Sequence, residues 1–115
     1  MALGIRLLGA GVISGAATTV LYPNSNYPVP AGVLGAIINN VRIVNTHATN
    51  STQVNLYYTP SGGSQLRILD QNKSINAGDL LVVKPDLTMV PADKIELVSA
   101  SGASLEWVVS GVDQK

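Results

Sequence analysis

His47 is the first residue to test for chemistry, because the chain has one histidine and no cysteine. A general base at neutral pH is most often a histidine. A serine nucleophile of the hydrolase type would need a Gly-x-Ser-x-Gly turn, and the sequence has none. His47 lies instead among Asn, Thr and Ser residues that favour turns, between two segments that alternate as strands do. We therefore expect His47 to be exposed near the tip of a β-hairpin, and we predict no catalytic residues.

Metal and cofactor sites are the next chemistry to consider. One histidine without cysteines cannot build a structural zinc site. Asp70, Asp79, Asp86 and Asp93 each lie at or near a turn, and oxygen ligands gathered there would suit calcium. The alternative is turn formation, in which an Asp side chain caps its own backbone. No phosphate-binding glycine motif precedes a helix pattern. We predict no cofactor and no metal.

Five aromatic residues could form a binding surface. They are four tyrosines and one tryptophan, with no phenylalanine. Tyr57 and Tyr58 are adjacent in a strand pattern, so they face opposite sides and at least one should lie near the surface or an interface. An exposed ring there could also stack on a carbohydrate. Trp107 alternates with Leu105 and Val109, which predicts a core position.

The segments that must position these residues read as short strands. Runs rich in Val, Ile, Leu, Thr and Tyr are separated by Gly, Pro, Asn and Asp, and helical periodicity is almost absent. The expected strands lie within residues 18–22, 33–46, 53–59, 65–69, 80–84, 95–100 and 105–112. About seven to nine strands at this spacing are typical of an antiparallel β-sandwich, jelly-roll-like. We predict an all-β fold with one domain over residues 18–115.

Residues 1–17 form an apolar segment with one basic residue and several glycines. A secretory signal peptide is one interpretation, although the glycines break its apolar run. The other is an extended or strand-like N-terminal arm that adds to a sheet edge of a neighbouring subunit. In that arm Leu3, Ile5 and Leu7 would share one face, with Arg6 opposite. The interface residues predicted on these grounds are Leu3, Ile5, Arg6, Leu7, Leu8, Tyr57 and Tyr58.

Charge is scarce along the whole chain. The formal net charge is zero, charged residues make up 12%, and none occurs between Arg6 and Arg42. Capture of nucleic acid or of an anionic membrane needs a basic patch, so we predict neither partner. A surface so poor in charge is weakly protected against association. We expect other protein to cover much of it.

The order of short motifs resembles the small β-sandwich proteins encoded among the virion genes of tailed bacteriophages. The motifs are Leu-Tyr at 21–22, Val-Pro-Ala-Gly at 29–32, Val-Arg-Ile-Val-Asn-Thr at 41–46, Val-x-Leu-Tyr at 54–57, Ala-Gly-Asp at 77–79, Asp-Lys-Ile-Glu-Leu at 93–97 and Val-Ser-Gly-Val at 109–112. They span about residues 18–112, and the N-terminal segment departs from the shorter leaders of that pattern.

That resemblance implies a non-enzymatic structural protein. The role it implies first is a capsid decoration (cement) protein that stabilises the head. A tail, baseplate or fibre component is the alternative. Its partners would be itself, as a homotrimer or another symmetric oligomer, and the major capsid protein or tail proteins. Its location would be the virion, assembled in the bacterial host cytoplasm. A carbohydrate-binding or adhesion module is the interpretation from a different class.

Overall fold

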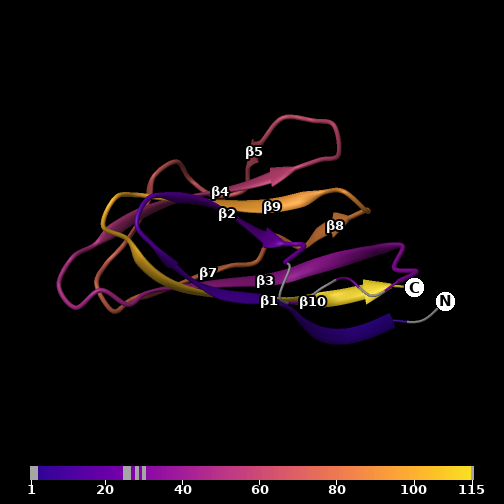
Figure 1. Ribbon diagram of the computed structural model, residues 1–115, viewed down its shortest axis with the longest axis horizontal. Coiled ribbons are helices and arrows are strands. Elements are labelled where there is room, and N and C mark those ends of the chain that lie inside the picture. The colour runs from indigo at the N-terminus through magenta and orange to yellow at the C-terminus, as the bar shows by residue number, and fades with distance from the viewer. Residues whose placement is uncertain (1–2, 25–26, 28, 30, 115) are drawn as a thin grey trace.

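The computed structural model describes residues 3–24, 27, 29 and 31–114; of residues 3–6 and 114 it describes the backbone alone. The fold is all-β, as predicted (Figure 1). The strands are β1 (Leu3–Ser14), β2 (Ala17–Tyr22), β3 (Gly35–Asn45), β4 (Thr52–Thr59), β5 (Leu66–Arg67), β6 (Lys73–Ile75), β7 (Leu80–Val83), β8 (Leu87–Met89), β9 (Lys94–Ser99) and β10 (Ser104–Gln114). No helix long and apolar enough to cross a membrane occurs among the described residues.

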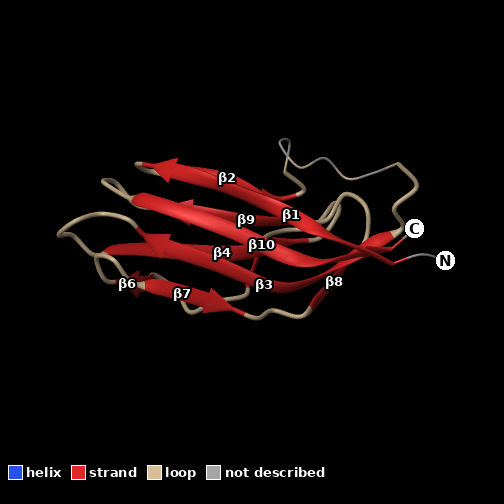
Figure 2. Ribbon diagram, turned by 90° about the horizontal axis from the view of Figure 1, so that it is seen from below, coloured by secondary structure: helices blue, strands red, loops and turns tan. Residues whose placement is uncertain are grey.

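Two antiparallel sheets pack face to face. Sheet A has the order β1-β10-β3-β7, with β8 also paired to β3, and sheet B has the order β2-β9-β4-β5, with β6 also paired to β4. Figure 1 shows sheet B above sheet A, and Figure 2 views the same molecule from the side of sheet A. β7 and β8 share one position beside β3, and β5 and β6 share one beside β4. Two sheets of four positions in this order form a jelly roll, which confirms the predicted sandwich.

The strands outnumber the prediction because two edge positions are interrupted. Between β7 and β8 the chain contains Pro85, which has no N–H to donate, and Asp86, whose φ of 48° is left-handed. Between β5 and β6 it contains Asn72, whose φ is 53°. Neither conformation continues a strand, so each position is built from two short pieces. The sequence pattern predicted β5 and β7 but not β6 and β8.

The N-terminal segment is a strand of sheet A. We expected residues 1–17 to form an arm on a neighbouring subunit. In the structure β1 pairs with β10 of the same chain from Leu3–Gln114 to Ser14–Ser104. Gly15, with a φ of 80°, then turns the chain towards β2 in sheet B. Residues 1 and 2 of the predicted arm lie outside the described residues.

Glycines in β1 make room for the only tryptophan. Trp107 is 3% exposed, which confirms its predicted core position. A Cβ atom on Gly9 or Gly11 would lie 3.0 Å from atoms of the Trp107 ring. The ring therefore occupies the space on β1 that side chains would otherwise fill, as aromatic residues do beside strand glycines.

The core lies between the two sheets and is made mainly of aliphatic side chains, with Tyr22, Met89 and Trp107. Its fully buried members include Leu21, Ile38, Ile43, Leu56, Ile95, Leu97, Leu105 and Val109. Every long strand contributes alternate residues to it, which is the pattern of a sheet with one face inward.

The segment that holds His47 is a connection between the sheets and not a hairpin. β3 lies in sheet A and β4 in sheet B, and the two strands do not pair. The hairpin prediction was therefore wrong. Alternation shows that a strand has a buried face, but it does not say whether the next strand lies beside it or opposite it.

Candidate protein-interaction surface

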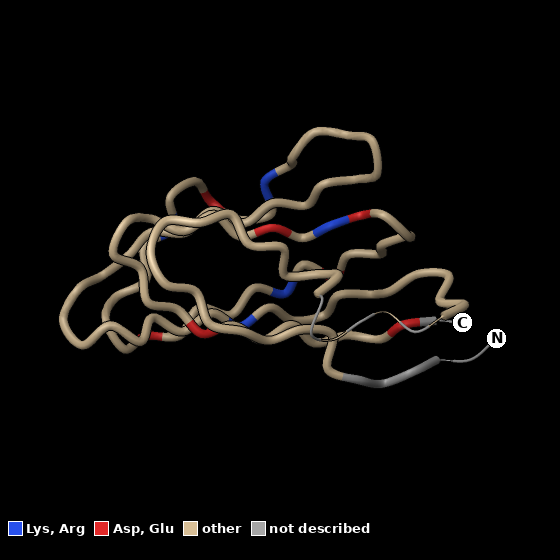
Figure 3. The backbone as a smooth tube through the Cα atoms, in the orientation of Figure 1, with Lys and Arg blue, Asp and Glu red and all other residues tan. Residues whose placement is uncertain are grey.

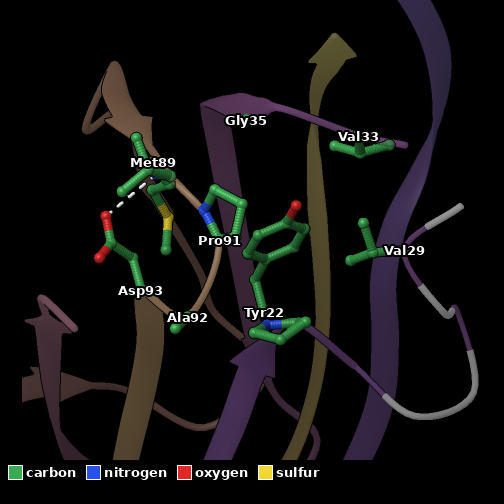
Figure 4. A pocket seen from close by; sticks show the side chains of 10 residues that line it. Tyr22, Val29, Val33, Gly35, Met89, Pro91, Ala92 and Asp93 are labelled. Carbon is green, nitrogen blue, oxygen red and sulfur yellow. Dashed lines mark hydrogen bonds between the residues drawn. The ribbon is translucent and has the colours of Figure 1, made fainter. Parts of the chain in front are cut away.

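A buried carboxylate, that of Asp93, lies at one end of the sandwich. Asp93 is buried, and its carboxylate accepts hydrogen bonds from the Tyr58 hydroxyl at 2.8 Å, the Ser61 N–H at 2.9 Å and the Val90 N–H at 3.1 Å. These bonds hold the β4–β5 and β8–β9 turns together. Figure 4 shows the carboxylate directed to the Val90 N–H.

Hydrogen bonding decides the ionisation of Asp93. Burial alone would raise the pKa of Asp93, but the hydrogen bonds from Ser61, Val90 and Tyr58 outweigh it and hold that pKa below its ordinary value of 3.8. Donation to Asp93, with burial and the neighbouring negative charge, raises the pKa of Tyr58. Asp93 is therefore an anion fixed by its partners, which is suited to holding turns and not to accepting a proton near neutral pH.

A small apolar pocket lies beside this network. Its volume is about 170 Å³, and its walls include Tyr22, Val29, Met89 and Pro91 (Figure 4). Asp93 is the only charged residue among those that line it. With that carboxylate already bonded, the pocket offers no free acid or base.

His47 also serves the local structure. Its Nδ1 atom accepts hydrogen bonds from the Thr49 N–H at 3.1 Å and the Asn50 N–H at 3.0 Å. The buried side chain of Asn45 accepts from the His47 N–H and donates to the carbonyl groups of Asn50 and Ile75. The ring and the amide together shape the β3–β4 connection. These hydrogen bonds support neither the hydrolase nor the metal interpretation of His47.

The four aspartates considered as calcium ligands, Asp70, Asp79, Asp86 and Asp93, do not form a metal site. Among the described residues, no three His, Asp or Glu side chains gather closely enough to hold a metal ion. Asp79 accepts a backbone hydrogen bond from Asn45 through its carbonyl and donates one to Asn76, as expected for a turn residue.

The predicted interface residues fall in three places. Tyr58 packs against the core, and Tyr57 lies on the opposite, outer side of sheet B with the Arg67 guanidinium 5.2 Å from its ring centre. Leu8 is fully buried, whereas Leu7 is 41% exposed. The side chains of Leu3, Ile5 and Arg6 lie outside the described part of the chain. Leu7 and Leu8 on β1 therefore lie in sheet A, and Tyr57 and Tyr58 on β4 lie in sheet B.

The outer side of sheet B is a polar network. Asn55 accepts hydrogen bonds from the Arg67 side chain at 2.7 Å and the Asn72 N–H at 2.9 Å, and donates to the Asn72 side chain. Glu96 accepts from Thr59 at 2.7 Å. Polar groups on this side are thus bonded to one another.

The outer side of sheet A is apolar. Cross-strand registers place Val12, Glu106, Val44 and Leu80 in one row across the sheet. The next row is Ala10, Val108, Arg42 and Val82. The third row, Leu7, Ser110 and Asn40, contains two polar residues, and a fourth row towards the chain ends pairs Val112 with Ile37. The apolar face, as we call this surface, consists of Leu7, Ala10, Val12, Ile37, Val44, Leu80, Val82, Val108 and Val112, with Arg42 and Glu106 as its charged members.

The apolar face is open to solvent in the single chain. Val12 is 73% exposed and Leu80 is 50% exposed. An open groove of about 560 Å³ crosses the face between these residues and Val108, and Tyr27 from the β2–β3 connection borders it. Charged residues are few along the backbone as a whole, as Figure 3 shows. Solvent-exposed valine and leucine in adjacent rows form the best candidate for a functional site.

Sequence reasoning missed the apolar face. Its signal was the run Leu80–Val83, in which four successive residues are apolar. A strand with one face in water alternates, so an uninterrupted run indicates that both faces avoid water. Assigning the run to one sheet with Val12 and Val108 required the strand order, which the pattern does not contain.

Comparisons with known proteins give a likeness in fold. No family model and no curated protein matches this chain. Chains from the structures of infectious bursal disease virus, strains Gx and Gt, are similar to it with 12% and 13% identity and TM-scores of 0.48 and 0.47. Each comparison covers 97% of this chain and 32% of the viral chain, so this chain spans about a third of those chains. We draw no functional conclusion from similarity at this level.

Proposed function

We propose that this protein is a non-enzymatic structural protein of a virion, which works through protein contacts made by the apolar face. The observation that carries the proposal is the apolar face itself, where Val12 and Leu80 are among the most exposed large hydrophobic residues of the described chain. Soluble monomers rarely expose contiguous apolar surface beyond a few hundred Å², and larger patches mark contact sites.

The reactive residue types support the same proposal. Asp93 and the Nδ1 atom of His47 are engaged in fixing turns. A protein that stabilises a particle surface through contacts needs a rigid fold whose connections are held by hydrogen bonds. It needs no reactive group.

The finer proposal is a capsid decoration (cement) protein of a tailed bacteriophage, bound to the major capsid protein in the virion and assembled in the bacterial cytoplasm. The motif order over residues 18–112 supports it, because it resembles proteins of that class. A tail, baseplate or fibre component would use the same fold and the same face, and it is the alternative role.

A carbohydrate-binding or adhesion module is the alternative from a different class. It would rest on Tyr57 or Tyr58 as a stacking ring. Arg67 lies over the ring of Tyr57, and Tyr58 is half-buried with its hydroxyl bonded to Asp93. Both arrangements weaken that alternative. Glycan binding lost in Tyr57→Ala would favour it.

Composition of purified particles tests the proposed function. We expect mass spectrometry to find this chain in particles at a constant ratio to the major capsid protein, and gold-labelled antibody to place it on the head. Labelling on the tail would select the alternative role. A chain absent from purified particles would contradict the proposal.

Particles that lack the protein allow the face itself to be tested. Wild-type protein should bind to them, and Val12→Lys with Leu80→Lys should abolish binding, because two ammonium groups would have to lose water in the contact. The matched control is Thr18→Lys, an exposed position on sheet B. Equal binding by all three proteins would show that the apolar face is not the contact surface.

A further inference from the structure

Two opposite charges stand alone on the apolar face. Arg42 on β3 is paired in register with Val108, and Glu106 on β10 is paired with Val44, so the two charged residues are diagonal neighbours. Both are exposed. Within the described part of the chain, neither side chain makes a hydrogen bond or an ion pair. A surface made mainly of valine, leucine, isoleucine and alanine, with Ser110 and Asn40 as polar members, thus carries one unpaired cation and one unpaired anion.

We infer that the apolar face binds the same face of a second copy of this chain, with Arg42 of each copy paired to Glu106 of the other. The inference rests on the proposed function, because it names the partner of the same contact surface.

Symmetry explains why a second copy fits. In a two-fold dimer the same patch faces itself, so its charges must be self-complementary. A two-fold axis that lies in the contact plane, perpendicular to the line from Arg42 to Glu106 and through its midpoint, sets each arginine opposite the partner's glutamate. One cation and one anion side by side meet this requirement, and both ion pairs form at once. A face bearing two like charges would repel its own copy.

The apolar rows supply most of the contact. Val12, Val44 and Leu80 flank Glu106 in one row, and Ala10, Val108 and Val82 flank Arg42 in the next. Two sheets that pack face to face bring such rows into interdigitating contact about 10 Å apart. The polar side of sheet B then faces outward from both copies, where its bonded groups remain in water.

Charge reversal with rescue tests the inference on the full chain. Molar mass is measured by light scattering and by sedimentation from about 1 to about 100 µM, the range that covers interfaces of ordinary strength. We expect a dimer for the wild type. Arg42→Glu alone and Glu106→Arg alone should each raise the dimer dissociation constant by about tenfold or more, because each sets like charges against each other. The double variant R42E/E106R should restore the wild-type value.

Lys94→Glu is the matched control, since it reverses one exposed charge on sheet B and should leave the dissociation constant unchanged. Circular dichroism melting of every variant shows that each one folds. A monomer across the concentration range, a trimer, or a dimer indifferent to the reversals would each overturn the inference. A wild-type monomer found in purified particles would overturn it while leaving the proposed function standing. If the protein were absent from purified particles, the proposed function would be contradicted but the dimer inference would not.

Discussion

The two outer surfaces of this sandwich differ in what they do with their side chains. On sheet B, Asn55, Arg67 and Asn72 bond to one another, and Glu96 bonds to Thr59. On sheet A, rows of valine and leucine point outward and the two charges are unpaired. The polar side chains of sheet B are therefore bonded within one chain, whereas sheet A exposes apolar and charged side chains without such bonds. This difference is the basis of our proposal that the outer side of sheet A is a contact surface.

The largest effect on stability is expected for a substitution on the inner side of sheet A, beneath the apolar face. Trp107→Ala would leave a cavity beneath Gly9 and Gly11, and we expect it to lower the free energy of unfolding by about 3 to 5 kcal/mol. Denaturant unfolding followed by circular dichroism measures this change. A loss below about 1 kcal/mol would mean that the ring does not hold β1 to the sandwich.

The next effect concerns the buried carboxylate at the end of the sandwich. Asp93→Asn removes charge-assisted hydrogen bonds, and we expect a loss of about 2 kcal/mol at pH 7 by denaturant unfolding. Because the folded-state pKa of Asp93 lies below 3.8, its contribution is complete above that pH and is lost as the pH falls through the lower folded-state value. The difference in the free energy of unfolding between the wild type and Asp93→Asn should therefore become smaller in acid. If this difference in the free energy of unfolding did not change with pH, the stabilisation would not come from the ionised Asp93 carboxylate.

A smaller effect is expected on the polar side of sheet B. Asn55→Ala removes the acceptor of Arg67 and of the Asn72 N–H, at an expected cost of about 1 kcal/mol because these groups can turn to water. Thermal melting measures it. No change in melting temperature would show that the sheet B network is not a stabilising one.

The smallest effect on stability is expected for a substitution on the apolar face. This result would distinguish the outer side of sheet A most clearly from that of sheet B. Val12→Thr keeps the branched shape on an exposed strand position, and we expect stability at low protein concentration to change by less than about 0.5 kcal/mol. Self-association, measured by sedimentation at high concentration, should weaken. A loss of stability as large as that of Asn55→Ala would erase the distinction between the two surfaces.

Much of the fold was readable from the sequence. Alternating apolar residues located β2, β3, β4, β9 and β10, and the position of Trp107 followed from its spacing to Leu105 and Val109. The interrupted edges were harder, since β6 and β8 are each three residues long and carry too little pattern. The pairing of β1 with β10 joins the two ends of the chain, and no local signal encodes contact at that separation.

The candidate site was harder to predict from the sequence, because it also depends on which strands lie together in the fold. Tyr57 and Tyr58 were singled out by residue type, but Arg67 and Asp93 engage them within the chain. Val12, Val44 and Val82 carry no chemical signal individually. They become a surface because four strands distant in sequence, β1, β10, β3 and β7, lie side by side in sheet A, and that order is a property of the whole fold.

Hydroxyl-radical footprinting tests most directly whether the apolar face is a contact surface. Side-chain oxidation would be compared between dilute protein and the same protein in purified particles. The account predicts that Val12, Leu80 and Val82 are oxidised in dilute solution and protected in particles. Oxidation of these three residues at the same rate in both states would show that the apolar face stays uncovered, and it would contradict the account.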